Sequence, residues 1–64
     1  MITINGKTQI YKQMTLLELL AEITLKTSVY AIEVNNKLIP HNEKDEYIVQ
    51  DGDSIEIVSL VGGG

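Results

Sequence analysis

The residues with the clearest chemical potential are the last three of the 64-residue chain, Gly62, Gly63 and Gly64. Glycine has no side chain and loses more backbone freedom on ordering than other residues, so three in succession contribute little to a strand or a core. We therefore expect residues 62–64 to form a flexible tail outside the domain formed by residues 1–61. The tail would present the terminal α-carboxylate on a slim stalk. A frayed terminus without a role is the alternative, because chain ends are commonly disordered.

Such a tail suits passage through a narrow channel in a partner's active site. Three extended residues reach about 10 Å, at about 3.3–3.6 Å per residue. No Cβ atom obstructs the passage, because the residues are glycines. We expect the chemistry of this protein to take place at the carboxylate of Gly64, with Gly62 and Gly63 serving as the stalk.

The apolar run before the tail suggests a docking surface. Residues 54–61 read as a strand, in which successive side chains point to opposite faces. If Ile55 and Ile57 face the core, Val58 and Leu60 lie on the other face, beside the tail. An uncovered apolar pair suggests a binding site for a partner protein. The alternative is a bulge, or an early end of the strand, that turns Val58 or Leu60 into the core.

Other candidate groups have simpler explanations. His41 is the only histidine and follows a proline in a polar loop, so we expect it at the surface without a catalytic role. Glu43, Asp45 and Glu46 lack the ligand spacing and the glycine of a calcium loop, so we expect no metal site. The three tyrosines have no basic surround for stacking nucleic-acid bases and are predicted to line the rim or core of the sheet. They are Tyr11, Tyr30 and Tyr47.

Composition restricts the class of protein. A chain of this length forms one domain with a small core and leaves no room for an internal catalytic cleft. It has no cysteine, so disulfides and thiolate metal sites are excluded. The net charge of -4 argues against nucleic-acid binding, and the N-terminal residues 1–5 resemble neither a signal peptide nor a membrane span. We expect a cytoplasmic protein with no bound cofactor that is monomeric when free.

A hairpin and a helix are predicted in the first half of the chain. Ile2 and Ile4 alternate with polar residues, Asn5-Gly6 is a tight-turn pair, and residues 8–11 resume an extended pattern. Thr15 and Glu18 have the spacing of a capping box, which predicts a helix from Leu16. The helix is expected to end near residues 26–28. Its apolar stripe consists of Leu16, Leu19, Leu20 and Ile23.

Three further extended segments follow. Residues 30–34 alternate as a strand and lead into the turn pair Asn35-Asn36, and residues 38–39 form a short extended piece that Pro40 confines to an edge. Residues 41–46 read as a polar loop, and residues 47–49 as a short strand or turn. The turn at residues 51–53 introduces the last strand. The order predicts an α+β fold in which a sheet of four or five strands packs on one helix, with a crossover through the helix.

At this point the sequence resembles the ubiquitin-like β-grasp sulfur carriers, and specifically the ThiS family of thiamin biosynthesis. The resemblance covers the whole chain, and it is the combination of segments that makes it specific. These segments are residues 31–35 (AIEVN), 38–40 (LIP), 50–53 (QDGD) and the terminal Gly63-Gly64. The third glycine, Gly62, goes beyond the family pattern and merely lengthens the stalk.

The resemblance implies a protein co-substrate rather than an enzyme. A ThiF-type adenylating partner, using ATP and Mg²⁺, would join the Gly64 carboxylate to AMP. A persulfide on a sulfur-donor protein would then displace AMP and leave a thiocarboxylate, and a ThiG-type thiazole synthase would receive the sulfur. Three alternatives stay open. They are the small subunit of molybdopterin synthase, a ubiquitin-like protein modifier, and a β-grasp binding domain whose glycines are inert.

Overall fold

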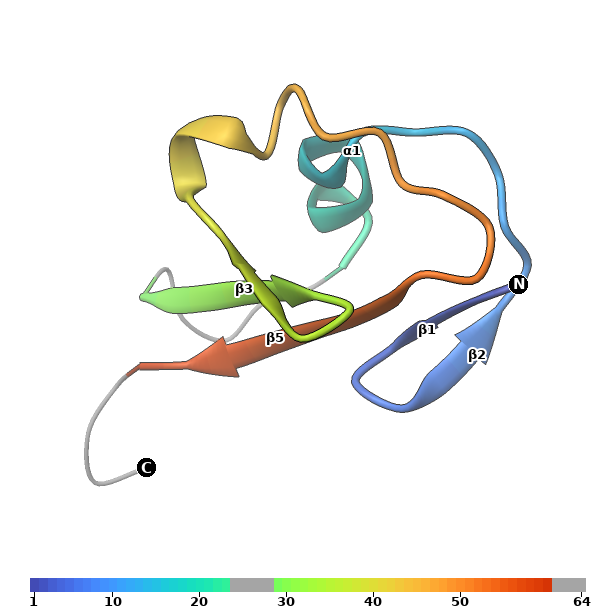
Figure 1. Cartoon of the computed structure of the whole chain (residues 1–64), viewed down its shortest axis with the longest axis horizontal. Coiled ribbons are helices and arrows are strands. Elements are labelled where there is room, and N and C mark those ends of the chain that lie inside the picture. Colours follow the sequence, from blue (N-terminus) through green and yellow to red (C-terminus); the bar gives the residue numbers. More distant parts are fainter. Residues whose placement is uncertain (24–28, 61–64) are drawn as a thin grey trace.

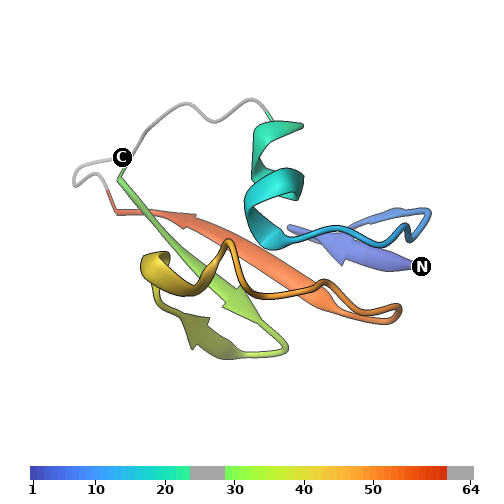
Figure 2. The ribbon, with the colours of Figure 1, turned by 90° about the horizontal axis from the view of Figure 1, so that it is seen from above.

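The computed structural model describes residues 1–23 and 29–60, which form one mixed sheet and one α-helix (Figure 1). The elements are β1 (Ile2–Ile4), β2 (Lys7–Gln9), α1 (Leu16–Ala21), β3 (Tyr30–Val34), β4 (Lys37–Ile39), the 3₁₀ helix η1 (His41–Glu43) and β5 (Ser54–Ser59). The five strands lie in the order β2-β1-β5-β3-β4. Only the pair β1 and β5 is parallel, and the other neighbours are antiparallel. The last strand of the chain therefore lies at the centre of the sheet, as Figure 2 shows.

Both predicted hairpin turns are present, and both depend on asparagine. Asn5 and Gly6 join β1 to β2 with φ angles of 50° and 81°, and Asn35 and Asn36 join β3 to β4 with φ angles of 54° and 69°. Two successive residues with positive φ give the turn whose twist matches that of two antiparallel strands. Asparagine and glycine tolerate this conformation better than other residues. The local sequence therefore sets the register of both hairpins.

The predicted start of α1 is confirmed. The Thr15 hydroxyl accepts from the backbone N–H of Glu18 at 3.1 Å, and the Glu18 carboxylate accepts from the N–H of Thr15 at 2.9 Å. The next two free donors of the helix are also satisfied. The N–H of Leu16 bonds to the carbonyl of Tyr47 at 3.0 Å, and that of Leu17 to the carbonyl of Lys44 at 2.9 Å. The first four N–H groups of an α-helix have no acceptor within the helix. In this protein the capping box satisfies two of them and the segment 40–53 satisfies the other two.

The predicted end of the helix is wrong. α1 ends at Ala21, and the residues at which we expected the end, 26–28, lie outside the described residues. The N–H groups of Glu22 and Ile23 bond to carbonyls three residues back, at 3.1 and 3.2 Å, so the last turn tightens and the α-helical pattern stops. Ile23 is β-branched, which lowers its helix propensity. It still packs against the core, as its place in the apolar stripe predicted.

The core lies between the sheet and a layer made of α1 and residues 40–53, which are on the same side of the sheet in Figure 1. The buried residues of the sheet are Ile2, Ile32, Val34 and Ile55, and those of the covering layer are Leu16, Leu19, Leu20 and Val49; Met14, just before α1, is buried with them. β2 and β3 run in the same direction, because each is antiparallel to one of the parallel strands β1 and β5. The connection through α1 therefore joins parallel strands, as predicted.

Three strand or loop boundaries differ from the prediction. β2 ends at Gln9, two residues before the expected end, and Ile10 is exposed. β5 ends at Ser59 rather than at residue 61, which lies outside the described residues. The predicted loop at residues 41–46 contains η1, and the segment 47–49 forms a single bridge between Ile48 and Thr15. The bridge at Ile48 depends on a contact distant in sequence, whereas η1 is held by bonds between residues three positions apart.

Candidate functional site

The tail, which was predicted to carry the chemistry, lies outside the described residues. This applies to Gly64, the predicted site of modification, and to Gly62 and Gly63. The structure does describe the strand that leads to the tail. Beyond the end of β5, the N–H of Leu60 still donates to the carbonyl of Val29 at 3.0 Å. The chain is therefore held against its neighbour up to the residue before the undescribed segment.

Val58 and Leu60, the residues predicted to bind a partner, are exposed. Val58 lies directly opposite Ala31 in the β3–β5 pair, on the face away from α1, and 46% of its surface is accessible. Leu60 is 57% exposed. Ile55 is fully buried and Ile57 half-buried on the other face. No bulge reverses the orientation in β5, so the alternation expected from the sequence is present; the role in binding stays a prediction.

A shallow hollow of about 440 Å³ lies next to Leu60. Its apolar lining consists of Val29, Ala31, Leu38, Ile39, Pro40 and Leu60. Tyr30 and His41 complete it. The hollow continues the apolar surface of Val58 and Leu60 around the end of β3 toward the edge strand β4. A partner that contacts Leu60 would therefore find apolar surface on that side as well.

His41 lies at the surface, as predicted, and is tied to Tyr30. Its Nε2 atom is 2.7 Å from the Tyr30 carbonyl oxygen, and the two rings meet edge to face with centroids 4.9 Å apart. Lys44 donates from Nζ to the Tyr30 hydroxyl at 3.3 Å and lies 5.6 Å from the ring centroid. These contacts join residues 41–44 to the start of β3. All three tyrosines are half-buried against the core. Tyr30 lies in the sheet, as predicted, whereas Tyr11 follows β2 and Tyr47 belongs to the segment 40–53.

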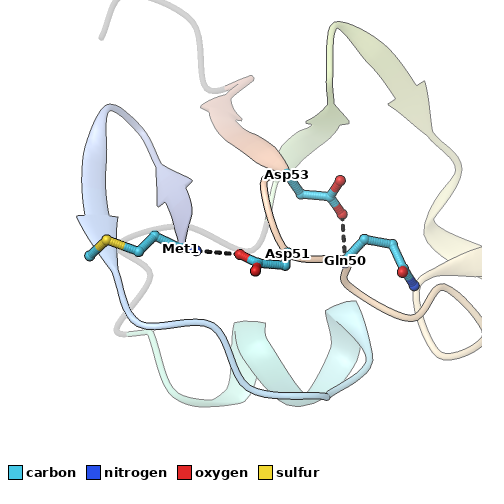
Figure 3. Close-up of polar contacts among 4 residues, drawn as sticks. All are labelled: Met1, Gln50, Asp51 and Asp53. Atoms are coloured by element: carbon cyan, nitrogen blue, oxygen red, sulfur yellow. Dashed lines mark hydrogen bonds and ion pairs between the residues drawn. The ribbon is translucent and has the colours of Figure 1, made fainter.

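Asp53 is the centre of a polar network at the other end of β5. It is 6% exposed. Its Oδ1 accepts from the Asn35 side chain at 2.9 Å, and its Oδ2 accepts from the Tyr47 hydroxyl at 2.9 Å. Oδ2 also accepts from the Gln50 backbone N–H at 2.8 Å, the contact drawn in Figure 3. Burial by itself raises the pKa of Asp53, but these hydrogen bonds outweigh it and lower the pKa below the ordinary value of 3.8. Asp53 is therefore a charged, satisfied structural anchor.

The contact with Asp53 also changes the pKa of Tyr47. Burial, the hydrogen bond to Asp53 and the negative charge of Asp53 together raise the pKa of Tyr47 to about 12. Each of these causes disfavours the phenolate. The hydroxyl therefore stays protonated and donates. The arrangement supports structure rather than proton transfer, because neither group faces an open site and both are committed to each other.

Two asparagine side chains fix β5 from both sides. Oδ1 of Asn5 accepts from the N–H of Ile57 at 2.7 Å, and Oδ1 of Asn35 accepts from the N–H of Ser54 at 2.9 Å. The same two residues form the turns next to β5. Thus each asparagine combines a left-handed backbone with a side-chain bond to the central strand. The sequence analysis identified both turns but missed these bonds, because the partners are distant along the chain.

The turn before β5 also holds the first residue of the chain. The amino group of Met1 pairs with the Asp51 carboxylate, as drawn in Figure 3, and the carbonyl of Met1 accepts from the N–H of Gly52 at 2.8 Å. Gly52 has a φ of 94°, which the predicted turn required.

The described residues contain no cluster of three metal-ligating side chains. Within the same residues, no helix is long and apolar enough to cross a membrane.

Comparison with known proteins identifies the family of this chain. The sequence model of the ThiS family matches residues 2–64. The chain belongs to the ThiS family. This ThiS-family chain is 36% identical over 66 residues to the sulfur carrier protein ThiS of Bacillus subtilis, with 100% of both proteins covered. It is also 34% identical over 64 residues to the thiazole synthase of Paramagnetospirillum magneticum, and these residues are 98% of this chain.

The two relatives differ in length. The ThiS-family chain spans the whole Bacillus subtilis protein but only 20% of the thiazole synthase. Among solved structures, the crystal structure of the thiamine biosynthesis protein (ThiS) from Geobacter metallireducens matches with a TM-score of 0.83 and 27% identity, covering 98% of this chain and 97% of the other. This match confirms the predicted ubiquitin-like β-grasp fold, with five strands and one short helix.

Proposed function

We propose that this protein carries sulfur for thiamin biosynthesis as a thiocarboxylate on Gly64. Membership of the ThiS family is the observation that supports this proposal most strongly, because relatives of the same length are sulfur carrier proteins. The protein would be a consumed and regenerated substrate of other enzymes rather than a catalyst. We place the cycle in the cytoplasm, where ATP is available.

The first step would activate the terminal carboxylate. A carboxylate is a poor electrophile because its charge is delocalised over two oxygens. In a ThiF-type partner, one oxygen of the Gly64 carboxylate would attack the α-phosphorus of Mg²⁺-bound ATP and release pyrophosphate. The acyl adenylate that forms has AMP as a good leaving group. ATP and Mg²⁺ belong to the partner's active site, and this chain would supply only the acyl group.

The second step would introduce sulfur. The terminal sulfur of a persulfide on a donor protein would attack the Gly64 carbonyl carbon, form a C–S bond and expel AMP. A thiol would then attack the donor sulfur and break the S–S bond. This oxidises the thiol to a disulfide with the donor and reduces the sulfur that stays on Gly64 as a thiocarboxylate. The product sulfur is nucleophilic when ionised, so it is suited to attack an electrophilic centre in a receiving enzyme.

We propose thiazole synthase as the receiving enzyme. A thiazole synthase contains a segment that is 34% identical to this chain, which supports a direct relation between such a carrier and that activity. The geometry of the described residues is consistent with a carrier. β5 is central in the sheet and pairs with β3 from Ile55 to Ser59, so the residues before the tail are held in one direction.

Intact-mass measurement tests this proposal. The purified chain is incubated with ATP, Mg²⁺, a ThiF-type enzyme of the same organism and a persulfide donor. We expect a mass increase equal to the exchange of one oxygen for sulfur, located on Gly64 by fragmentation. A variant that lacks Gly63 and Gly64 is the control and should not change. Attachment to lysine side chains would instead identify a protein modifier, and no change in the full chain would contradict the proposal.

A further inference from the structure

The face of the sheet opposite α1 divides into zones along β5. Toward the tail it is apolar, with Val29, Ala31, Val58 and Leu60, and Leu38 on β4 adds exposed apolar surface directly opposite Glu33. Next to them the register places Glu33 directly opposite Glu56. We call these seven residues the docking face. No helix or loop of residues 1–23 and 29–60 packs over it, because α1 and the segment 40–53 cover the other side (Figure 1).

Glu33 and Glu56 are an unfavourable pair within the isolated protein. Residues directly opposite on neighbouring antiparallel strands have Cβ atoms about 4.5–5.5 Å apart, and like charges in such positions are destabilising. On one side of the pair lie Ala31 and Val58, and directly opposite Glu33 on β4 lies Leu38, which is 66% exposed. Two carboxylates thus lie together at the margin of an apolar surface.

The described residues supply no cation to this pair. Lys7 lies opposite Ile4, and Lys37 opposite Val34, so the register places both lysines on the side of the sheet that carries α1. Lys12 pairs with Glu22 at 3.2 Å. Lys44 donates to Tyr30. All four lysines of the described residues are therefore directed elsewhere, and the chain has no arginine.

The apolar surroundings of Glu33 and Glu56 require a binding partner to supply a positive charge. A partner that packs on Val58, Leu60 and Leu38 would also remove water from Glu33 and Glu56. Burial of a carboxylate without a counter-charge is strongly unfavourable. A partner that only matched the apolar zone would therefore bind poorly. A guanidinium group offers several donors in a planar fork and can contact two carboxylates at once, which suits a pair at this spacing.

We propose that the docking face binds the adenylating partner through an arginine that lies between Glu33 and Glu56, surrounded by apolar side chains of the partner. This inference rests on the proposed function, because it names the partner that activates Gly64. The apolar zone provides contact area next to the tail. The carboxylate pair selects a partner with a matching cation and fixes the orientation in which the tail enters the active site.

The proposal predicts opposite effects on binding and on folding. In the double variant Glu33→Gln/Glu56→Gln, the side chains keep their size but lose the charge that the arginine requires. We expect Kd for the ThiF-type enzyme of the same organism to rise at least tenfold and to depend less on salt concentration. The melting temperature should be equal to or higher than that of the parent chain, because the repulsion between the two carboxylates is gone.

The double variant Glu43→Gln/Glu46→Gln is the matched control. It removes two negative charges from exposed residues in the segment that lies on the other side of the sheet. Its Kd should stay within twofold of the parent value, measured by calorimetric titration in the same buffers. The inference is overturned if Glu33→Gln/Glu56→Gln binds within twofold of the parent, or if the control loses as much affinity. Absence of binding by the parent chain also overturns it.

Adenylation of the parent chain separates this inference from the proposed function. In an ATP–pyrophosphate exchange assay with the same enzyme, the parent chain should support exchange. If it does not, the proposed function fails. If it does, and both double variants bind like the parent, the role of Glu33 and Glu56 fails while the sulfur-carrier proposal stands.

Discussion

The Tyr47 hydroxyl donates to Oδ2 of Asp53 across 2.9 Å, and this contact joins the segment that covers the core to the start of the central strand. Tyr47 also provides, through its carbonyl, an acceptor for the first turn of α1. Asp53 bonds in turn to Asn35 in the β3–β4 turn. The helix, the covering segment and two strands thus meet at one carboxylate, at the end of β5 away from the tail.

Removal of the Tyr47 hydroxyl should destabilise the fold without disturbing the core. Tyr47→Phe keeps the ring but leaves Asp53 with one donor fewer, and a hydrogen bond to a charged group contributes about 1.5–3 kcal/mol. We expect the free energy of unfolding to fall by about 1.5 kcal/mol in urea denaturation. Tyr11→Phe is the control, because Tyr11 is half-buried like Tyr47 but lies outside the Asp53 network. Equal losses in both variants would contradict this role of the hydroxyl.

Asn35 should matter through both its backbone and its side chain. Asn35→Gly keeps the positive φ but loses the bonds to Asp53 and Ser54, so we expect a loss of about 1–2 kcal/mol in the free energy of unfolding. Asn35→Ala should cost about 1 kcal/mol more, because alanine is strained in the left-handed region. Asn36→Gly, at φ 69°, is the control and should stay within about 0.5 kcal/mol. If the alanine and glycine variants at position 35 are equally stable, the backbone argument is wrong.

The Asp53–Tyr47 pair should limit stability at both extremes of pH. The folded state lowers the pKa of Asp53 below 3.8, so its contribution is present above about pH 4 and is lost as the pH falls toward the folded value. The folded state raises the pKa of Tyr47 from 10.0 to about 12, so that contribution is complete below pH 10 and is lost as the pH rises toward 12. Melting temperatures across pH 2–12 measure both limbs, in steps of about one unit.

The Tyr47→Phe variant assigns the alkaline limb. The relevant quantity is the difference in stability between the variant and the parent chain, because effects of pH that are common to both cancel in it. This difference should be largest near neutral pH and should shrink between pH 10 and 12. In that range the parent chain loses the stabilisation by the protonated Tyr47 hydroxyl, which the variant lacks at every pH. A difference that stays constant over this range would show that Tyr47 does not titrate as proposed.

Local chemistry made much of this fold predictable from the sequence. The turn pairs Asn5-Gly6 and Asn35-Asn36, and the capping box of Thr15 and Glu18, depend on residues only a few positions apart. The alternation in β5 also sufficed to place Val58 and Leu60 on the exposed face. In each case the sequence signal and its structural cause lie within one segment.

Contacts between distant segments were not predictable in the same way. The bond between Asn5 and Ile57 joins residues 52 positions apart, and the bond from Asn35 to Asp53 spans 18. Asp53 was identified as a turn residue, although its buried carboxylate organises the surrounding loops. The opposition of Glu33 and Glu56 likewise depends on the strand order, which places β5 beside β3. Without knowledge of the strand order, Glu33 and Glu56 are simply two acidic residues far apart in the sequence.

Leu60 provides a test of the apolar part of the docking face. Leu60→Glu adds a charge to a side chain that is 57% exposed, so the fold should tolerate it. Burial of the new carboxylate against an apolar partner surface is unfavourable, and we expect at least a tenfold weaker Kd for the ThiF-type enzyme. Leu17→Glu is the control on the exposed side of α1 and should bind within twofold of the parent. Unchanged affinity of the Leu60 variant would remove Leu60 from the interface.

Gly63 should be required for transfer and not for folding. In Gly63→Val, a β-branched side chain widens the stalk and disfavours glycine-only backbone angles. We therefore expect a parent-like melting temperature, because the tail is predicted to lie outside the core, together with at least a tenfold lower rate of thiocarboxylate formation by intact-mass kinetics. Gly62→Ala is the control, since Gly62 goes beyond the family pattern of two terminal glycines, and it should keep most of the rate. If Gly63→Val reacts at the parent rate, the channel does not require a bare stalk. If it instead lowers the melting temperature, Gly63 has a structural role that the tail hypothesis does not include.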